Sequence, residues 1–203
     1  MTYDSTKHNR RSIRLPGYDY AQAGAYFVTL VTHQRQCLFG EIVDGAMLVG
    51  SHGDTVKEEW LRSAEVRREI ELDAFVLMPN HIHGIVVIRD QSTVVGAHGR
   101  APLPPMPHRP PRSLGSFVAG FKSAVTKRIN EIRGTAGLPV WQRNYYDRVI
   151  RDEEELSRIR QYIIDNSARW AEDPENPNAV GAVREPPLRG RPSSSRGSLP
   201  VRP

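Results

Sequence analysis

The sequence predicts an α+β domain, and three observations lead to that fold class. Residues 25–33 (AYFVTLVTH) alternate in character and are rich in β-branched and aromatic side chains, which favours a strand. Residues 75–88 (FVLMPNHIHGIVVI) contain two apolar runs on either side of a Pro-Asn step, and both are typical of buried strands. Apolar residues recur at helical spacing in three other stretches. Strands and amphipathic helices on one chain predict a sheet with helices packed on it.

A hairpin and a helix are predicted between these two strand regions. Asp44-Gly45 lies between apolar residues, and such a pair favours the tight turn of a small β-hairpin. A helix then runs to about Arg68, and either Ser51 or Asp54 offers the side-chain oxygen of an N-cap. The predicted buried face of this helix consists of Val56, Trp60, Leu61 and Ala64.

The pair of histidines in the second central strand is the main functional signal. Side chains alternate along a strand, so His81 and His83 point the same way while Ile82 points into the opposite layer. Gly84 has no side chain and leaves room for a bulky group to approach the backbone. Two imidazoles side by side on an otherwise apolar strand need an explanation, and a divalent metal is the simplest one.

A proline-rich insertion and a second helix follow the histidines. Residues 90–112 are dense in proline, glycine and basic residues, which predicts a long loop or partly disordered insertion. Residues 113–132 predict an amphipathic helix whose other faces carry cations, among them Lys122 and Arg128. These cations either form a solvated outer face or contact phosphate groups. The apolar stripe of the helix consists of Leu114, Phe117, Val118, Phe121, Val125 and Ile129.

A last strand, a third helix and a tail are predicted after that. Residues 140–150 (VWQRNYYDRVI) are aromatic and β-branched with interleaved arginines, which favours a strand. Asp152 caps the next helix and Glu155 stands three residues later, as in a capping box. Residues 173–203 are rich in proline, serine, glycine and arginine and predict a disordered basic tail. The buried face of the third helix consists of Leu156, Ile159 and Ile163.

Two polar residues on the third helix complement the histidines. Tyr162 and Asn166 are four residues apart, so they lie one above the other beside the apolar stripe. From there both can face the same point as His81 and His83, in a groove between helix and sheet. Two imidazole nitrogens and one amide oxygen form a mixed ligand set that suits Mg²⁺ or Mn²⁺ loosely and later transition metals more tightly. Taken singly, Tyr162 also fits a half-buried boundary tyrosine and Asn166 a helix C-cap.

Composition narrows the classes of function. The net charge of +5 favours a polyanionic partner, nucleic acid above others. The single cysteine, Cys37, excludes a disulfide framework and a cysteine-based zinc site, and it fits a reducing cytoplasm. No signal-peptide pattern or membrane-spanning run is found. Arg10, Arg11 and Arg14 predict a basic arm over residues 1–19, which is either solvated or clamps phosphates.

Together, these residues resemble the single-tyrosine HUH transposases of the insertion-sequence type, in particular the REP-associated tyrosine transposases. His81-Ile82-His83 matches the HUH motif, in which U is a bulky hydrophobe, and Tyr162 matches the nucleophile on the helix after the last strand. Asn166 stands where the family has a polar residue that completes the metal site. The resemblance covers most of residues 20–170, and its stretches are GAYFVTLVTHQRQCLFG (24–40), VLMPNHIHGIVV (76–87), SFVAGFKSAVTKRIN (116–130) and WQRNYYDRVIRDEEELSRIRQYIIDN (141–166).

The resemblance implies a ferredoxin-like catalytic domain over residues 20–172, with a central antiparallel sheet and helices packed on it. It also implies a bacterial, cytoplasmic and nucleoid-associated enzyme that nicks and joins single-stranded DNA carrying a REP-like hairpin, with Mg²⁺ or Mn²⁺ as cofactor. Tyr162 would attack a backbone phosphate and leave a 5′-phosphotyrosyl link and a free 3′-OH. The basic residues expected to contact DNA are Arg10, Arg11, Arg14, Lys122, Arg128 and Arg143.

Several alternatives stay open at the level of sequence. Tyr145 and Tyr146 compete with Tyr162 as nucleophile, although they lie on the predicted strand and lack the spacing to Asn166. Ser167 follows Asn166 where the REP-associated members have a proline. The chain acts either as a monomer in cis or as a homodimer. The alternative functions are a hairpin-DNA-binding protein that does not cleave and a metal-dependent nuclease without covalent capture.

Overall fold

The alternating residues of the first strand form the centre of the sheet. β1 (Gly24–Val31) pairs antiparallel with β5 (His81–Ile88) on one side and with β6 (Tyr146–Ile150) on the other. β4 (Ile70–Leu77) pairs antiparallel with the free edge of β5, which gives the spatial order β4-β5-β1-β6. β1 and β5 are thus flanked on both sides, and their residues are correspondingly apolar.

The computed structural model describes residues 17–90 and 112–179. Arg10, Arg11 and Arg14 of the predicted arm, nearly all of the predicted insertion and the tail from residue 180 onward lie outside these residues. The other elements are η1 (His33–Arg35), β2 (Gly40–Val43), β3 (Ala46–Val49), α1 (Ser51–Val66), α2 (Leu114–Arg133), α3 (Glu153–Asp165) and η2 (Ser167–Glu172).

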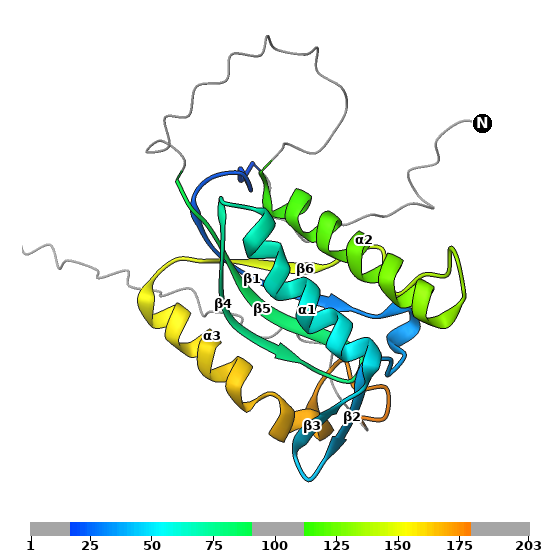
Figure 1. Cartoon of the computed structure of the whole chain (residues 1–203). Helices are drawn as coiled ribbons and strands as arrows, with labels where there is room; N and C mark the ends of the chain where they lie inside the picture. Colours follow the sequence, from blue (N-terminus) through cyan, green and yellow to red (C-terminus); the bar gives the residue numbers. More distant parts are fainter. Residues whose placement is uncertain (1–16, 91–111, 180–203) are drawn as a thin grey trace, which may run out of the picture.

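The path of the chain through the sheet is that of a ferredoxin-like domain. The strands and the helices between them follow the order β1-α1-β4-β5-α2-β6, which is a βαββαβ unit (Figure 1). α3 follows the last strand and is an addition to this unit. The predicted α+β class, with a central antiparallel sheet and helices packed on it, is confirmed. Within the described residues, no helix is long and apolar enough to cross a membrane.

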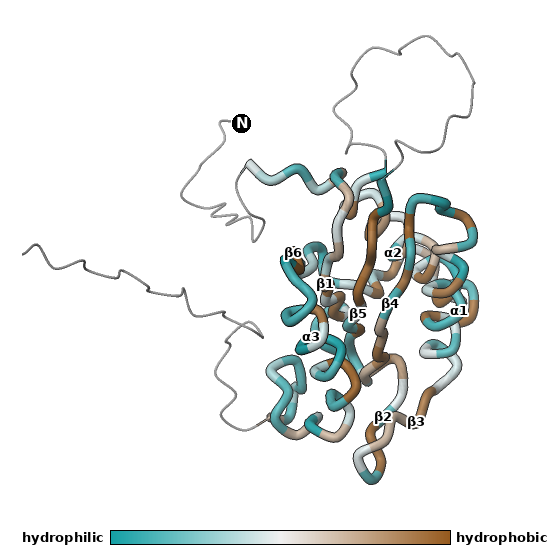
Figure 2. The backbone as a smooth tube through the Cα atoms, turned by 90° about the vertical axis from the view of Figure 1, so that its left-hand side faces the viewer, coloured by the Kyte–Doolittle hydropathy of each residue, from teal (hydrophilic) through white to brown (hydrophobic). Residues whose placement is uncertain are grey.

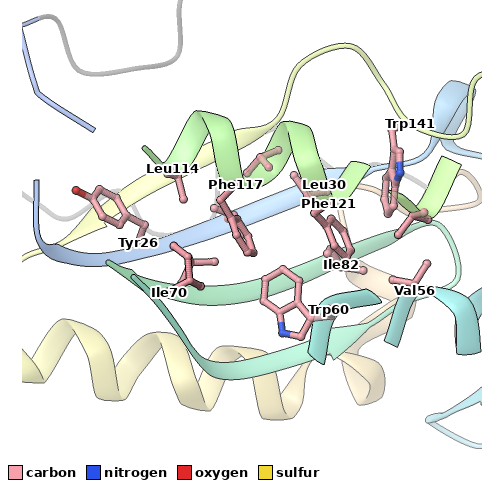
Figure 3. Packing of buried hydrophobic residues seen from close by; sticks show 14 of the residues in the cluster. Tyr26, Leu30, Val56, Trp60, Ile70, Ile82, Leu114, Phe117, Phe121 and Trp141 are labelled. Atoms are coloured by element: carbon pink, nitrogen blue, oxygen red, sulfur yellow. The ribbon is translucent and has the colours of Figure 1, made fainter. Parts of the chain in front are cut away.

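Helices cover both faces of the sheet, and strand alternation decides which residues meet which helices. Val28 and Ile82 belong to the larger apolar cluster, to which α1 and α2 contribute their buried faces (Figure 3). Phe27 and Ile85 point the other way and pack against Ile159 of α3. Figure 2 shows the resulting three layers, with the apolar strand β5 between α3 and α1. The histidines share the α3 face, because they have the same parity as Ile85 along β5.

The bulky group predicted to approach Gly84 is the indole of Trp60. A Cβ atom at Gly84 would lie 2.5 Å from Trp60 Cζ2, so only glycine fits beneath the ring. The fully buried ring stacks on Phe75 at 4.8 Å and meets Phe117 and Phe121 edge-on at 5.7 and 5.4 Å (Figure 3). These neighbours hold the indole in place.

Replacing Gly84 by alanine is therefore expected to lower the free energy of unfolding by about 2 kcal/mol or more, because the added methyl group overpacks a rigid core. Urea unfolding followed by circular dichroism measures the change. Gly120→Ala is the matched control: it is exposed on α2, and its Cβ would meet only the end of the Arg67 side chain at 3.4 Å. That variant should be as stable as wild type or slightly more stable.

Turns and caps agree with the sequence predictions except at the start of α1. Asp44 and Gly45 both adopt positive φ (50° and 74°), as the predicted β2–β3 hairpin requires. The N-cap of α1 is Gly50, which has no side-chain cap, so the prediction of Ser51 or Asp54 as the cap is wrong. Both residues lie inside the first turn, because the chain enters the helix directly from β3 and Gly50 N–H bonds Phe39 O at 2.9 Å.

The third helix, α3, is capped by Asp152 as predicted, whereas the last strand is shorter than predicted. Asp152 Oδ1 accepts the Glu155 N–H at 2.7 Å, while Glu155 Oε2 accepts the N–H of Arg151 rather than that of the cap residue itself. β6 begins at Tyr146 instead of residue 140. Trp141 forms only an isolated bridge to Thr32, after which the chain leaves the sheet before rejoining it.

Candidate active site

Two neighbouring strands place the histidines at one end of the sheet. The Pro-Asn step turns the chain between β4 and β5, so His81 is the first residue of β5. The register sets His83 opposite Thr29 of β1 and His81 opposite Val31. Both imidazoles are almost fully buried, at 0% and 2% exposure. Polar rings so deeply buried on an apolar strand need defined partners.

Hydrogen bonds on the Nδ1 atoms fix both rings. Asn80 Nδ2 donates to the carbonyl oxygens of Arg35 and Glu175 at 3.1 and 2.7 Å, which leaves Asn80 Oδ1 to accept from His81 Nδ1 at 2.9 Å. The His81 proton is therefore on Nδ1, and its Nε2 carries a lone pair. Thr29 Oγ1 bonds His83 Nδ1 at 2.8 Å. This arrangement, with Nδ1 held by a polar partner and Nε2 directed inward, is that of metal-binding histidines.

A third ligand group reaches the two rings from the segment after α3. The Nε2 atoms of His81 and His83 are 3.1 Å apart, and Asp173 Oδ2 lies 3.7 Å from His81 Nε2. The three ligand atoms all lie within 4.8 Å of one another. Two nitrogen ligands about 2.1 Å from one cation, at right angles, are roughly 3 Å apart. The donors therefore fit a single divalent cation.

Burial gives these groups the charges that a cation site requires. It lowers the pKa of His83 to about 3 and the pKa of His81 well below its usual value, so both imidazoles are neutral at neutral pH. Burial also raises the pKa of Asp173 to about 6, against the opposing effect of the Glu175 N–H bond to its carboxylate. At pH 7 the centre thus consists of two neutral imidazoles and one carboxylate with no cationic side chain between them.

Tyr162 on α3 faces this centre. Its hydroxyl lies 3.3 Å from His83 Nε2, and its ring meets those of His83 and Phe27 at 5.2 and 6.0 Å. Burial raises the pKa of Tyr162, and the negative charge of Asp173 raises it further. The phenol therefore stays protonated in the absence of a cation, and positive charge at the histidines would favour the phenolate.

Asn166 stands one turn beyond Tyr162, as the C-cap of α3. It is buried at 3% exposure, and its Oδ1 has no hydrogen-bond partner among the described residues. Burial raises the pKa of both Tyr162 and Asp173, and the neighbouring Asn166 side chain opposes that rise. An unpaired buried carbonyl oxygen next to Tyr162 and Asp173 is a further observation that fits a bound cation. The sequence-predicted residues His81, His83, Tyr162 and Asn166 thus lie together.

Asp173 is the residue that sequence reasoning missed, because the tail was expected to begin there. Residues 173–179 instead fold back in successive turns: Asp173 Oδ1 accepts from Glu175 N–H at 2.7 Å, and Asn176 Oδ1 from Asn178 N–H at 2.9 Å. Glu175 also pairs with Arg35 at 2.9 Å. The signal that could have found it was the string DPENPN, whose Asp and Asn residues favour such turns.

Two ion pairs hold α3, the helix that carries Tyr162, in place against the sheet. Arg160 makes two hydrogen bonds of 2.9 and 2.6 Å to the carboxylate of Asp73, which stands in a bulge of edge strand β4. Glu155, buried near the start of α3, pairs with Arg148 of β6. The two-pronged contact of Arg160 with Asp73 fixes orientation as well as distance.

The other residues singled out from the sequence lie away from the centre. Thr29 of β1 lies between His83 of β5 and Tyr146 of β6, so Tyr146 is two strands away from His83. Tyr145 packs against the apolar cluster beneath α1 and α2. Arg128 pairs with Glu58 and Glu59 at 2.6 and 2.9 Å. Lys122 donates to the carbonyl oxygens of Gln142 and Asn144, and Arg143 is exposed.

Comparisons with known proteins give one clear relative and a shared fold. No protein-family profile matches the chain. An uncharacterized protein of Haemophilus influenzae is 36% identical over 181 residues, which cover 84% of this chain and 95% of that protein. The structure of a REP-associated tyrosine transposase bound to a REP hairpin superposes with a TM-score of 0.50 at 15% identity, over 77% of this chain and 73% of that one. A candidate transposase of Deinococcus radiodurans gives a TM-score of 0.41 at 20% identity, over 76% and 96% of the two chains.

Identity above 30% along nearly the whole of the relative establishes common descent with that protein, and the TM-score of 0.50 establishes the fold. The chain therefore belongs to the family of this Haemophilus influenzae protein and has the fold of a REP-associated tyrosine transposase.

Proposed function

We propose that the protein is a metal-dependent, single-stranded DNA endonuclease and strand-transferase that acts on hairpin DNA through a covalent 5′-phosphotyrosine. The main support is the 3.3 Å distance between the Tyr162 hydroxyl and His83 Nε2, at the edge of a cluster of metal-ligating groups. The fold supports a hairpin substrate, because the solved transposase with this fold is bound to a REP hairpin. Action on the DNA of a bacterium would place the protein at the nucleoid, in the cytoplasm.

In the proposed reaction, the Tyr162 oxygen forms a bond to the phosphorus of a backbone phosphodiester, and the bond from phosphorus to the 3′ oxygen breaks. The departing oxygen gains a proton to become a 3′-OH, the tyrosine proton passes to solvent, and the 5′-phosphate remains on Tyr162. Because the new bond is again a phosphodiester, attack by another 3′-OH reverses the step and joins two strands. Such a reaction needs no ATP.

Three side chains prepare Tyr162 and the ligand groups for that step. Thr29 and Asn80 hold the imidazoles so that both Nε2 atoms face the same point. The Asn166 side chain opposes the rise in the pKa of Tyr162 and so favours its ionised form, while its unpaired Oδ1 offers a further oxygen ligand. A divalent cation held by these groups would supply positive charge for the phenolate and for the phosphate. The mixed N/O donor set favours Mn²⁺ over Mg²⁺.

One experiment separates this function from the two alternatives. A single-stranded hairpin oligonucleotide is incubated with the protein and Mn²⁺ or Mg²⁺, and the products are separated on a denaturing gel. A covalent protein–DNA adduct supports the proposal. A mobility shift on a native gel without cleavage identifies a binding protein, and cleavage that survives Tyr162→Phe identifies a nuclease without covalent capture.

Metal affinity is expected to depend on pH through Asp173. The pKa of this carboxyl is about 6, so protons compete with the cation below that pH, and affinity falls about tenfold per unit as the pH is lowered. The histidines remain neutral in this range, since their pKa values are lowered by burial. Calorimetric titration with Mn²⁺ between about pH 5 and 7.5 checks the slope.

Asp173→Asn is the control, because it keeps the shape of the side chain and removes the titrating group. The variant should bind Mn²⁺ more weakly at neutral pH and show little change in affinity with pH. A wild-type affinity that is flat across this range, or an unchanged slope in the variant, would exclude Asp173 as a ligand.

The proposed oligomeric state, a monomer, follows from the fact that one chain supplies all the residues of the site. His81, His83, Asp173, Tyr162 and Asn166 meet within one chain, with α3 of that chain covering its own sheet. A chain that contributes both nucleophile and ligands to one centre supports action in cis as a monomer. Analytical ultracentrifugation of the protein with hairpin DNA measures the stoichiometry.

A further inference from the structure

Asp173, the third ligand group, lies on a turn after η2 rather than on a strand or an α-helix. One of its carboxylate oxygens, Oδ1, accepts the N–H of Glu175 at 2.7 Å. The other oxygen, Oδ2, is the one that lies 3.7 Å from His81 Nε2. The direction in which the ligand oxygen points therefore depends on where Glu175 is held.

Glu175 is held from two sides by parts of the chain that are distant in sequence. Its Oε2 accepts a hydrogen bond from Arg35 Nε at 2.9 Å, and its carbonyl oxygen accepts one from Asn80 Nδ2 at 2.7 Å. Both side chains of the ion pair are largely shielded from solvent, at 27% and 26% exposure. Such shielding makes an ion pair stronger than one in open water. The Arg35–Glu175 pair therefore ties the turn that carries Asp173 to η1.

Arg35 adopts a costly backbone conformation at the place where it makes this contact. Gln34 and Arg35 both have positive φ, at 54° and 57°. Neither residue is glycine, and the left-handed region brings a Cβ atom too close to the following carbonyl oxygen. In this turn the Arg35 carbonyl oxygen accepts from Asn80 Nδ2 at 3.1 Å, while its side chain reaches Glu175. Strain of this kind gathers at functional sites, which indicates that the placement of Arg35 matters beyond stability.

Asn80 links these contacts to the first histidine. Its Nδ2 donates to the carbonyl oxygens of both Arg35 and Glu175, and its Oδ1 accepts from His81 Nδ1 at 2.9 Å. The Asn80 side chain is fully buried, so water does not compete for these bonds. Two of the three ligand groups, His81 and Asp173, are therefore positioned by one set of contacts, and Arg35 is the cation of that set.

We propose that Arg35 is a positioning residue of the metal centre, which acts by holding Glu175 so that the Asp173 carboxylate faces the histidines. Arg35 does not itself ligate the cation in this role. A purely structural ion pair is the competing interpretation, and it would stabilise the fold without acting through Asp173. The inference rests on the proposed function only as far as a cation is bound at these ligands.

The dependence of Mn²⁺ affinity on Arg35 is the first test. Arg35→Ala should weaken Mn²⁺ binding about tenfold at neutral pH, as is typical when a ligand group loses the neighbours that orient it. In the Asp173→Asn background, the same substitution should have no further effect, because the group through which Arg35 acts is then gone. Calorimetric titration of wild type, the two single variants and the double variant gives this coupling.

Two further variants separate positioning from a general loss of an ion pair. Arg89→Ala removes an arginine that pairs with Glu71 at 2.8 Å just beyond the opposite end of β5, and it should leave Mn²⁺ affinity unchanged. The exchanged pair, Arg35→Glu with Glu175→Arg, should bind Mn²⁺ more tightly than either single reversal, because the attraction between the two side chains is restored.

Amide hydrogen exchange tests the same inference without metal. The N–H of Glu175 is bonded to Asp173 Oδ1, so its exchange rate reports whether the turn is held. In metal-free Arg35→Ala this amide should exchange at least about tenfold faster than in wild type, because the turn then opens locally. The amides of β5 should keep their protection, which verifies that the variant is folded.

Equal Mn²⁺ affinity in wild type and Arg35→Ala, or equal exchange at Glu175, would overturn the inference and leave the metal centre intact. A loss of affinity that persists in full in the Asp173→Asn background would also overturn it, and so would a loss of protection throughout β5. A wild-type protein that binds no Mn²⁺ would instead contradict the proposed metal dependence and this inference together. None of these measurements requires cleavage, so their results are independent of whether Tyr162 is the nucleophile.

Discussion

His83→Ala is expected to weaken Mn²⁺ binding at least about 100-fold and to abolish the covalent reaction with DNA. The variant removes the imidazole that lies between another ligand and the nucleophile: its Nε2 is 3.1 Å from His81 Nε2 and 3.3 Å from the Tyr162 hydroxyl. The remaining donors would no longer surround one point. Calorimetric titration at pH 7.5 measures the affinity, and circular dichroism verifies that the variant is folded.

Two further variants make this result specific. Thr29→Val keeps the ligand but removes the hydrogen bond to its Nδ1, and should weaken binding about 10-fold to 100-fold. His52→Ala removes a histidine of α1 and should have no effect on metal affinity. Equal affinity in wild type and His83→Ala would show that the cation, if bound at all, is held elsewhere.

Tyr162→Phe is expected to reduce DNA cleavage roughly a thousandfold or more while leaving metal affinity within about twofold of wild type. The phenol oxygen is the proposed nucleophile, and its loss removes the reacting atom without altering any of the three ligand groups. The ring itself stays, so its contacts with Phe27 and His83 are kept. Single-turnover cleavage of a labelled hairpin oligonucleotide gives the rate, and calorimetry gives the affinity.

Tyr146→Phe is the matched control for this loss. Tyr146 also lies on the α3 side of the sheet, on β6 opposite Thr29. Its substitution therefore removes a phenol oxygen from the same face of the sheet but from a neighbouring strand. It should cleave at close to the wild-type rate. The reverse pattern, an active Tyr162→Phe and an inactive Tyr146→Phe, would move the nucleophile to β6.

The fold followed from the sequence because its signals are local. Alternation along β1 and β5 decides which residues face α1 and α2 and which face α3, and the Asp44-Gly45 turn and the Asp152 cap act within a few residues. The start of α1 was misplaced because Gly50, not a side-chain cap, begins that helix. The last strand was overestimated because the residues after Trp141 leave the sheet for several positions.

The same periodicities account for how much of the site was predictable. The two-residue alternation of a strand places His81 and His83 on one face of β5. In a helix, residues four positions apart are neighbours, so Tyr162 lies next to Asn166. Asp173 carries no such signal, because its position depends on how the chain turns after α3. The hydrogen bonds from Asn80 to distant carbonyl oxygens are likewise tertiary contacts that no local pattern specifies.

The most direct test of the central claim is to locate the DNA-linked residue by mass spectrometry. The protein is reacted with a single-stranded hairpin oligonucleotide and Mn²⁺, the DNA is trimmed with nuclease, and the peptides are sequenced. A 5′-phosphonucleotide on Tyr162 is the predicted result. A nucleotide on Tyr145 or Tyr146, or cleaved DNA with no modified peptide, would contradict the assignment of Tyr162 as the nucleophile.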